Sequence, residues 1–300
     1  MDVSHNVLSV TKAFGSLQEL EELDVSSNSI RDSELAERPL RGLLRLNLAD
    51  NALDDFEGRM YPSLCFVNLE LNQLRQFPSH WSDVKGDSLE ILLSCNPLCR
   101  LVLFALPVIT RLALKNCRLK ALPLDFSRWL ADLEEVDLSE NDLSNIAQLS
   151  GCLQLRSLNL SHNQISDCNM LMGGLSCWRK LSVFDLRWNP LTAGFYGKID
   201  VDIPQSLVVD SKDRAAEDDK LTCRRLFYRA LCIYRLKATL TILDGIAVSN
   251  QEKAQAGGIL SKCKTLVAHQ VRLSGGSRES SQEWLNDEDG RRTDSFFHRR

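Results

Sequence analysis

The chain has 300 residues, of which 44% are hydrophobic and 25% are charged, and its formal net charge at pH 7 is −4. This composition supplies ample apolar material for a core, while the small net charge of mixed sign argues against a general nucleic-acid-binding surface. The N-terminus shows no signal peptide, and the sequence holds no run of about 18 apolar residues, so we expect no membrane contact through a spanning helix.

One short pattern recurs along the chain in steps of 21 to 26 residues. Each copy places apolar residues five and three positions before a polar residue and another two positions after it, as in Leu46, Leu48, Asn51 and Leu53. The polar position falls at Asn6, Asn28, Asn51, Asn72, Asn96, Cys117, Asn141, Asn163 and Asn189. Nine copies in register predict a repeat architecture.

The residue types in the repeat indicate its local structure. Alternating apolar residues are expected to point inward from a short strand, and the asparagine amide can satisfy backbone groups at the turn that follows. Return segments such as 33–41 and 147–152 fit a single helical or 3₁₀ turn. The pattern LxxLxLxxN resembles that of leucine-rich repeats. We therefore expect an α/β leucine-rich repeat solenoid, with a parallel β-sheet on the concave face, short helical or 3₁₀ turns on the convex face and a helical C-terminal cap.

The chain is expected to divide into five parts. Residues 1–196 hold about nine repeats, and a polar insert follows at 197–220. A C-terminal cap at 221–252 combines a helix with a strand and turn. A helical extension follows at 253–273, and residues 274–300, rich in Gly, Ser and charges, form a tail that we expect to be disordered. Because the first repeat begins at Met1 in its middle, we favour a fragment of a longer protein over an uncapped first repeat.

The sequence contains no constellation of residues that indicates catalysis. Its five histidines show no HExxH spacing, and it lacks phosphate-binding glycine motifs. The paired acids Glu21–Glu22 and Glu134–Glu135 precede repeat strands and are expected at solvated edges. Ten scattered cysteines lack paired CxxC motifs, so we expect reduced thiols in a cytosolic or nuclear protein. We predict no enzyme activity, cofactor, metal or small-molecule substrate.

The repeat register predicts which side chains project from the concave face. Nine strands spaced at about 4.8 Å would form a face on the order of 40 Å long, more than a standard protein interface requires. Repeats four to six place Phe66, Leu71, Leu92 and Ala113 there as an apolar strip. Aromatic and arginine side chains are typical anchors for a protein partner. The candidate protein-binding residues are Arg45, Phe66, Glu70, Leu92, Arg111, Lys115, His162, Arg187 and Trp188.

An alternative exists for the two aromatic candidates. Phe66 and Trp188 could instead pack against a neighbouring loop or the insert at 197–220.

The end of the array carries the more specific resemblance. The segments WNPLTAGFY (188–196), RRLFYRALCIYRLKATLTILDG (224–245) and IAVSNQE (246–252) bracket the polar insert. The repeat length and the LDG turn resemble the intracellular class that includes the regulatory subunit of protein phosphatase-1, tubulin cofactor E and the spliceosomal A-prime protein. The last third resembles the fungal spindle-pole-body scaffolds of the mitotic-exit and septation-initiation networks, relatives of animal centriolin. The resemblance covers about residues 1–270, and the tail does not match the family.

This resemblance implies a non-catalytic protein-binding scaffold at the spindle pole body or another microtubule-organising centre of the cytoplasmic cytoskeleton. Its implied partners are signalling regulators, such as a GTPase-activating complex or kinase subunits, or spindle-pole anchors. The alternative is a regulatory subunit that binds a single enzyme such as a protein phosphatase. An axonemal or RNA-associated assembly shares the fold with less support. A scaffold predicts a much longer natural chain, whereas a dedicated regulator predicts a complete protein of about this size.

Overall fold

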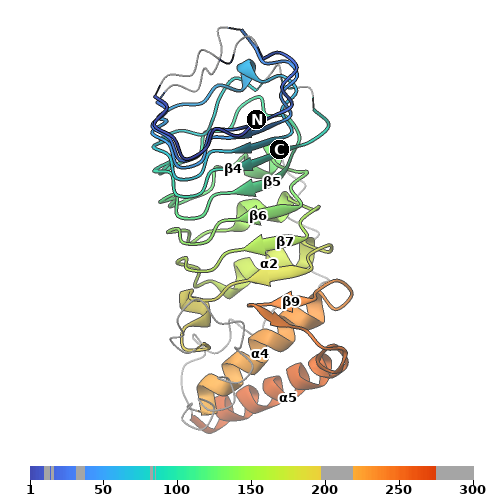
Figure 1. The fold of residues 1–300 in the computed structure, drawn as a ribbon. Helices are drawn as coiled ribbons and strands as arrows, with labels where there is room; N and C mark the ends of the chain where they lie inside the picture. The colour runs from blue at the N-terminus through green and yellow to red at the C-terminus, as the bar shows by residue number, and fades with distance from the viewer. Residues whose placement is uncertain are drawn as a thin grey trace, which may run out of the picture.

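The computed structural model describes residues 1–9, 14, 17–31, 38–81, 84, 86–196 and 219–274, with the side chains of 219, 220, 223 and 263–274 excluded. Within these ranges, ten strands form one sheet in chain order, and all neighbours are parallel except the last pair (Figure 1). The strands are β1 (Glu22–Asp24), β2 (Arg45–Asn47), β3 (Phe66–Asn68), β4 (Leu89–Leu92), β5 (Ile109–Ala113), β6 (Glu135–Asp137), β7 (Ser157–Asn159), β8 (Val183–Asp185), β9 (Ile242–Leu243) and β10 (Ile246–Ala247). The leucine-rich repeat solenoid expected from the sequence is confirmed.

The core is a stack of apolar side chains that each repeat contributes from its strand. Each strand from β1 to β9 buries one apolar side chain at the same register position, because successive side chains of a strand point to opposite faces. These buried residues are Leu23, Leu46, Val67, Ile91, Leu112, Val136, Leu158, Phe184 and Leu243. Each repeat therefore covers the apolar side of the next, and the stability of the solenoid depends on contacts between neighbours.

The asparagines form the hydrogen-bonded ladder that the sequence predicts. Asn72 is representative: its amide donates to the carbonyls of Leu69 (3.1 Å) and of Leu48 in the preceding repeat (2.9 Å). Its side-chain oxygen accepts from the backbone N–H of Leu53, also in the preceding repeat, at 3.0 Å. The asparagines from Asn28 to Asn189 thus satisfy backbone groups of two repeats at once, whereas the exposed Asn6 bonds only within the first repeat.

Cys117 occupies one position of this ladder and makes only some of the hydrogen bonds that an asparagine makes. Its thiol lies 3.3 Å from the Leu93 carbonyl of the preceding repeat, but it offers no oxygen to the N–H of Leu98. That N–H instead donates to the carbonyl of Asn96 at 2.9 Å. Burial raises the pKa of the Cys117 thiol to about 12, so the group remains a neutral part of the core. The eight cysteines whose side chains are described are free.

The return segments carry short helices, as expected for the convex side. They are η2 (Gly58–Met60), α1 (Phe126–Trp129), η3 (Ala147–Gly151), α2 (Cys168–Cys177) and η4 (Pro190–Thr192). The turn predicted at 147–152 is η3, whereas residues 33–37 of the segment 33–41 lie outside the described ranges. With ten residues, α2 is longer than one turn. The side chain of Asp167 caps it by accepting from the N–H of Asn169, and its residues Leu171 and Leu175 are buried.

Two helices and a hairpin follow the last repeat (Figure 1). Helix α4 (Asp219–Arg235) precedes β9 and β10, and α5 (Asn250–Ser274) follows them. The hairpin turn holds Asp244 and Gly245 at φ 54° and 75°, as a two-residue type I′ turn requires. Residues 197–218 of the expected insert and 275–300 of the expected tail lie outside the described ranges. The extension expected at 253–273 is not a separate element, because α5 begins at Asn250.

Helix α5 starts inside the expected cap because local side chains favour a helix start there. Ser249 and Glu252 form a reciprocal capping box, with the Ser249 N–H donating to Glu252 (2.8 Å) and the Glu252 N–H donating to Ser249 (3.2 Å). Glu252 also pairs with Arg229 of α4 at 2.8 Å. Although partial burial alone would raise the pKa of Glu252, its hydrogen bonds to Arg229 and Ser249 lower it below the usual value.

The buried carboxyl group of Asp244 ties the end of the solenoid together. It accepts hydrogen bonds from the Leu186 N–H (2.7 Å), within the last full repeat, and from the Tyr196 hydroxyl (2.5 Å). Burial raises the pKa of Asp244 to about 6. Asp244 therefore joins the hairpin to two earlier segments at a fully enclosed position.

Candidate protein-binding face

Three columns of outward-facing residues cross the concave face, because the parallel strands are stacked in register. The first column runs Glu22, Arg45, Phe66, Glu90, Arg111, Glu135, Ser157, Val183 and Ile242. The second column runs Asp24, Asn47, Asn68, Leu92, Ala113, Asp137, Asn159 and Asp185. The third column lies two residues further along each repeat and includes Glu70, Ser94, Lys115 and Arg187.

Charges alternate along the first column. Arg111 lies between two carboxylates, 3.7 Å from Glu90 and 3.4 Å from Glu135. The guanidinium of Arg45 lies 4.2 Å from the ring centre of Phe66. These side chains are about half exposed, so each pair adds little to stability, but the pairing holds their positions.

The second column is polar except at two positions. The side-chain oxygens of its aspartates and asparagines accept from the backbone N–H two residues later, at 2.8 to 3.2 Å. Leu92 and Ala113 have no such oxygen, so they place apolar surface where every other repeat from β1 to β8 places a hydrogen-bonded polar group. This break lies at the middle of the sheet.

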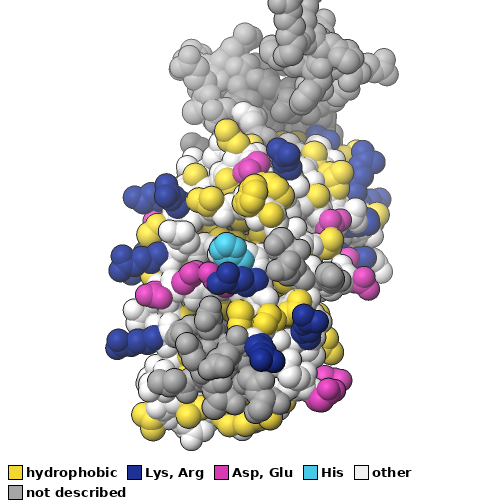
Figure 2. All heavy atoms as spheres, turned by 90° about the horizontal axis from the view of Figure 1, so that it is seen from above, with side chains coloured by type: hydrophobic (Ala, Val, Ile, Leu, Met, Phe, Trp, Pro, Cys, Tyr) yellow, Lys and Arg dark blue, Asp and Glu magenta, His cyan; other side chains and the backbone are white. Residues whose placement is uncertain are grey.

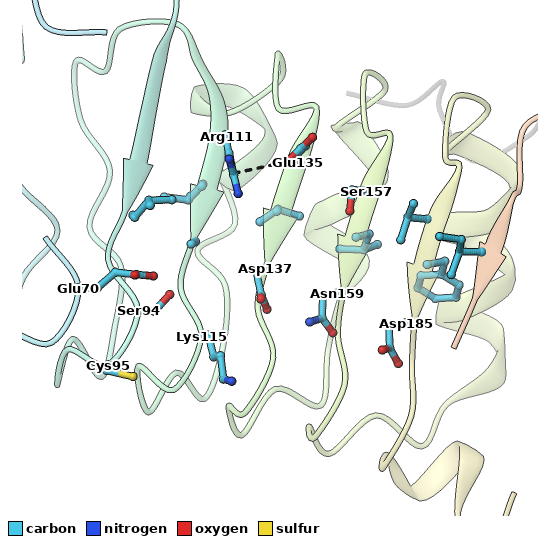
Figure 3. Close-up of a pocket in the computed structure, with 18 of the residues that line it drawn as sticks. Glu70, Ser94, Cys95, Arg111, Lys115, Glu135, Asp137, Ser157, Asn159 and Asp185 are labelled. Atoms are coloured by element: carbon cyan, nitrogen blue, oxygen red, sulfur yellow. Dashed lines mark ion pairs between the residues drawn. The ribbon is translucent and has the colours of Figure 1, made fainter. Parts of the chain in front are cut away.

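A groove of about 650 Å³ begins at this break and extends along the concave face to β9 (Figure 3). Leu71, Leu92 and Ala113 line it, and Leu71 is 55% exposed. Its charged lining consists of Glu70, Arg111, Lys115, Glu135, Asp137 and Asp185. Carboxylates thus outnumber cations, and both cations already have partners. Arg111 pairs with Glu135, and Lys115 pairs with Glu140 at 3.1 Å, a contact that raises the pKa of Lys115.

Predicted candidates near the cap form a second cluster. The rings of His162 and Trp188 stack with centroids 4.4 Å apart, and the guanidinium of Arg187 lies 4.8 Å from the Trp188 ring. Arg187 also makes a two-pronged contact with Asp185, at 3.0 and 2.6 Å. Although partial burial alone would lower the pKa of Arg187, these bonds raise it. These contacts join the three side chains into one cluster, which presents a half-buried aromatic ring beside an exposed imidazole.

The structure thus distributes the nine predicted residues over three places. Glu70, Leu92, Arg111 and Lys115 line the groove, and His162, Arg187 and Trp188 form the cluster near the cap. Arg45 and Phe66 stack on each other outside the groove lining. Asp185 links the first two groups, because it lines the groove and holds Arg187.

A backbone feature that the repeat pattern does not reveal positions several of these side chains. The residue before each ladder position has a left-handed backbone, with φ between 51° and 61°. These residues are His5, Ser27, Asp50, Leu71, Cys95, Asn116, Glu140, His162 and Trp188. Bulky residues such as Leu71 and Trp188 adopt this conformation at a cost of about 1–2 kcal/mol. The only signal in the sequence is a large apolar residue in a column that is mostly polar.

Within the described residues, no group of three or more His, Cys, Asp or Glu side chains could hold a metal ion. No described helix combines the length and apolar character that crossing a membrane requires. On the end of the molecule seen from above Figure 1, basic and acidic side chains are interspersed (Figure 2).

Comparisons with known proteins agree with this fold. Residues 107–165 match the leucine-rich repeat family model. The septation initiation network scaffold protein cdc11 of Schizosaccharomyces pombe is 35% identical over 89 residues, which are 30% of this chain and 8% of that protein. Adenylate cyclase of the same yeast is 33% identical over 178 residues, 55% of this chain and 10% of that protein. The chain spans less than half the length of the curated relatives it matches.

Among solved structures, a leucine-rich repeat protein of Leptospira interrogans is 22% identical with a TM-score of 0.54, covering 88% of this chain and 59% of that chain. This likeness shows the fold alone. Leucine-rich repeat domains are generally modules for protein–protein interaction and are typically not enzymes.

Proposed function

We propose that this chain, a leucine-rich repeat protein by its matched repeats and its fold, is a non-catalytic scaffold whose concave face binds a segment of a partner protein. The observation that carries the proposal is the break in the second column. Leu92 and Ala113 replace hydrogen-bonded polar residues at the middle of the sheet, and the exposed Leu71 adds to the same apolar strip. Exposed apolar side chains with a polar rim are typical of protein interfaces.

Charge indicates which segment would suit the groove. Its carboxylates exceed its cations, and Arg111 and Lys115 are already paired with acids. A partner segment that places an apolar side chain on the strip and a basic side chain beside Glu70 or Asp137 would be complementary in both respects. The cluster around Trp188 then offers a second contact toward the cap.

The cellular role we propose is that of a scaffold at the spindle pole body or microtubule-organising centre in septation signalling. The similarity to the cdc11 scaffold supports this role, together with the cap segments that bracket the polar insert. Regulators such as a GTPase-activating complex or kinase subunits, or spindle-pole anchors, are the proposed partners.

The test combines localisation with paired variants. A fluorescently tagged chain is expected to form foci that coincide with a spindle-pole marker. A variant with Leu71→Glu and Leu92→Glu should lose its partner and its foci. Leu153→Glu is the matched control, since Leu153 is 53% exposed and lies outside the groove lining. Circular dichroism and thermal melting verify that all variants remain folded.

Each outcome of this experiment decides one part of the proposal. Foci that persist in the double variant refute the role of the groove. A chain that never reaches the poles, but copurifies in equal amounts with one phosphatase, refutes the scaffold and favours a dedicated regulatory subunit.

A further inference from the structure

The return segments of repeats five and six expose apolar side chains away from the groove. Val102 is 63% exposed, Phe104 78% and Leu124 91%. Residues 101 and 103 are buried leucines, so the alternation of this extended segment turns Arg100, Val102 and Phe104 outward.

Contacts between the two repeats bring these side chains onto one surface. The Cys99 N–H donates to the Cys117 carbonyl at 3.1 Å, which places the start of one return segment beside the start of the next. The rings of Phe104 and Trp129 lie 6.0 Å apart, and Trp129 belongs to α1 of the following repeat. The guanidinium of Arg128 lies 5.6 Å from the Trp129 ring.

Cations border the apolar side chains at the end of the segments nearer to the asparagine ladder. Arg100, Arg118 and Lys120 are exposed, and no ion pair joins any of them to another residue within the described part of the chain. This differs from the groove, where Arg111 and Lys115 have acidic partners. We call Arg100, Val102, Phe104, Arg118, Lys120 and Leu124 the return-segment patch.

In the two repeats that flank the patch, the two residues that follow the ladder leucine are polar and exposed. They are Arg75 and Gln76 in repeat four, and Ser144 and Asn145 in repeat seven. Large exposed apolar side chains are therefore concentrated in the return segments of repeats five and six, while Leu153 of repeat seven is an isolated case. Such a concentration is typical of a localised contact surface.

We propose that the return-segment patch is a second docking surface, which binds an acidic protein segment carrying apolar side chains. The apolar anchors would cover Phe104 and Leu124, and the acids would pair with Arg100, Arg118 and Lys120. This partner has the opposite charge to the one that suits the groove, so the two surfaces can hold two different proteins at once, as a scaffold requires.

A charged bilayer fits the patch less well than a protein segment. The net charge of −4 repels an anionic membrane from the molecule as a whole, whereas a bound segment meets only the local charge. Asp125 also lies between Leu124 and α1, where its carboxylate accepts from the Trp129 indole N–H at 2.9 Å. A docked segment can leave this acid in water, but an inserted membrane surface would bury it.

The experiment measures binding of a fluorescein-labelled peptide in which glutamate and aspartate alternate with phenylalanine and leucine. Fluorescence anisotropy is expected to show saturable binding that weakens with salt. The double variants Arg100→Glu with Lys120→Glu, and Phe104→Ser with Leu124→Ser, should each raise the Kd about tenfold or more. All four substituted side chains are exposed, so the fold is expected to survive.

Matched controls separate this proposal from the one for the groove. Arg179→Glu and Leu153→Ser alter exposed residues of the same types elsewhere and should leave the Kd within about twofold. Leu71→Glu alters the groove and should also leave peptide binding unchanged. Loss of binding in Leu71→Glu, or equal binding of a peptide with lysine in place of the acids, overturns the assignment.

Phosphatidylserine vesicles form the last arm of the experiment. Cosedimentation that depends on Phe104 and Arg100, without binding of the acidic peptide, would replace the protein segment by a lipid surface. Absence of saturable binding by the wild-type chain to the acidic peptide also overturns the proposal.

Discussion

Asn141 is the ladder residue whose substitution should lower the stability of the solenoid most. Its amide donates to the carbonyl of Leu114 in the preceding repeat at 2.8 Å and to that of Leu138 at 3.0 Å. Its oxygen accepts from two backbone N–H groups, those of Leu119 (2.9 Å) and Cys117 (3.1 Å). The side chain is buried, so water cannot replace these bonds in the folded chain.

The Asn141→Ala variant leaves two buried N–H donors without an acceptor. An unsatisfied buried polar group costs about 1–3 kcal/mol, and a carbonyl tolerates the loss of one donor more readily than an N–H tolerates the loss of its acceptor. We therefore expect the free energy of unfolding to fall by about 2–4 kcal/mol. In Asn163→Ala only the Leu143 N–H loses its acceptor, so the expected loss is smaller, about 1–2 kcal/mol.

Urea denaturation followed by far-ultraviolet circular dichroism measures the difference. Asn6→Ala is the control, because Asn6 is exposed at the first repeat and should change stability by less than about 0.5 kcal/mol. If the slope of the free energy of unfolding against urea concentration is the same in all variants, a shift in the urea midpoint reflects a change in stability. If Asn141→Ala is no less stable than Asn6→Ala, the ladder does not stabilise the repeats through buried hydrogen bonds.

Three further predictions concern the cap, the convex side and the core. The carboxyl of Asp244 has a pKa of about 6 in the folded chain, against an ordinary value of 3.8, so it binds its proton more tightly when folded. Its contribution to stability is present below about pH 4 and is lost as the pH rises through 6, by up to about 3 kcal/mol. Asp244→Asn should remove this part of the pH dependence of the free energy of unfolding in urea. If the wild-type chain and Asp244→Asn show the same pH dependence, the prediction is wrong. A Cβ on Gly174 would lie 2.3 Å from the ring of the buried Trp178, so Gly174→Ala should lower the melting temperature measurably. A Cβ on Gly173 would meet no atom within 4 Å, so Gly173→Ala is the control and should leave the melting temperature unchanged. Iodoacetamide should label the exposed Cys99 in the native chain and Cys117 only after unfolding, as peptide mass mapping would show.

Much of the fold could be predicted because the same sequence pattern recurs in every repeat. An apolar residue at every second position must face one side of a strand, and an asparagine at a constant offset recurs where each strand ends. Local composition also indicated the cap: the sequence predicts a helix followed by a strand and turn within 221–252, and α4 spans Asp219–Arg235. Boundaries were less accurate where capping decided them, as with the Ser249–Glu252 pair that starts α5.

The sequence predicts which residues lie on the concave face, but it does not predict how their side chains combine into a binding site. The register correctly places Leu92 and Lys115 on the outward side, since it follows from strand alternation alone. It also places Leu71 on this face, but it does not show the left-handed backbone, at φ 55°, that orients Leu71 in the groove. Nor does it show that Arg111 would be held between two carboxylates from neighbouring strands.

The sequence by itself determined the features that one repeat can encode: which side chains are buried, where each strand ends and how the asparagines recur. Only the tertiary structure decided the features that join residues from different repeats. These include the groove over Leu92 and Ala113, the stack of His162 on Trp188, and the contact of Phe104 with Trp129. The physical reason is that burial follows from a periodic pattern within one strand. Contacts between side chains 20 or more positions apart depend instead on how closely the repeats stack and on how each turn directs its side chain.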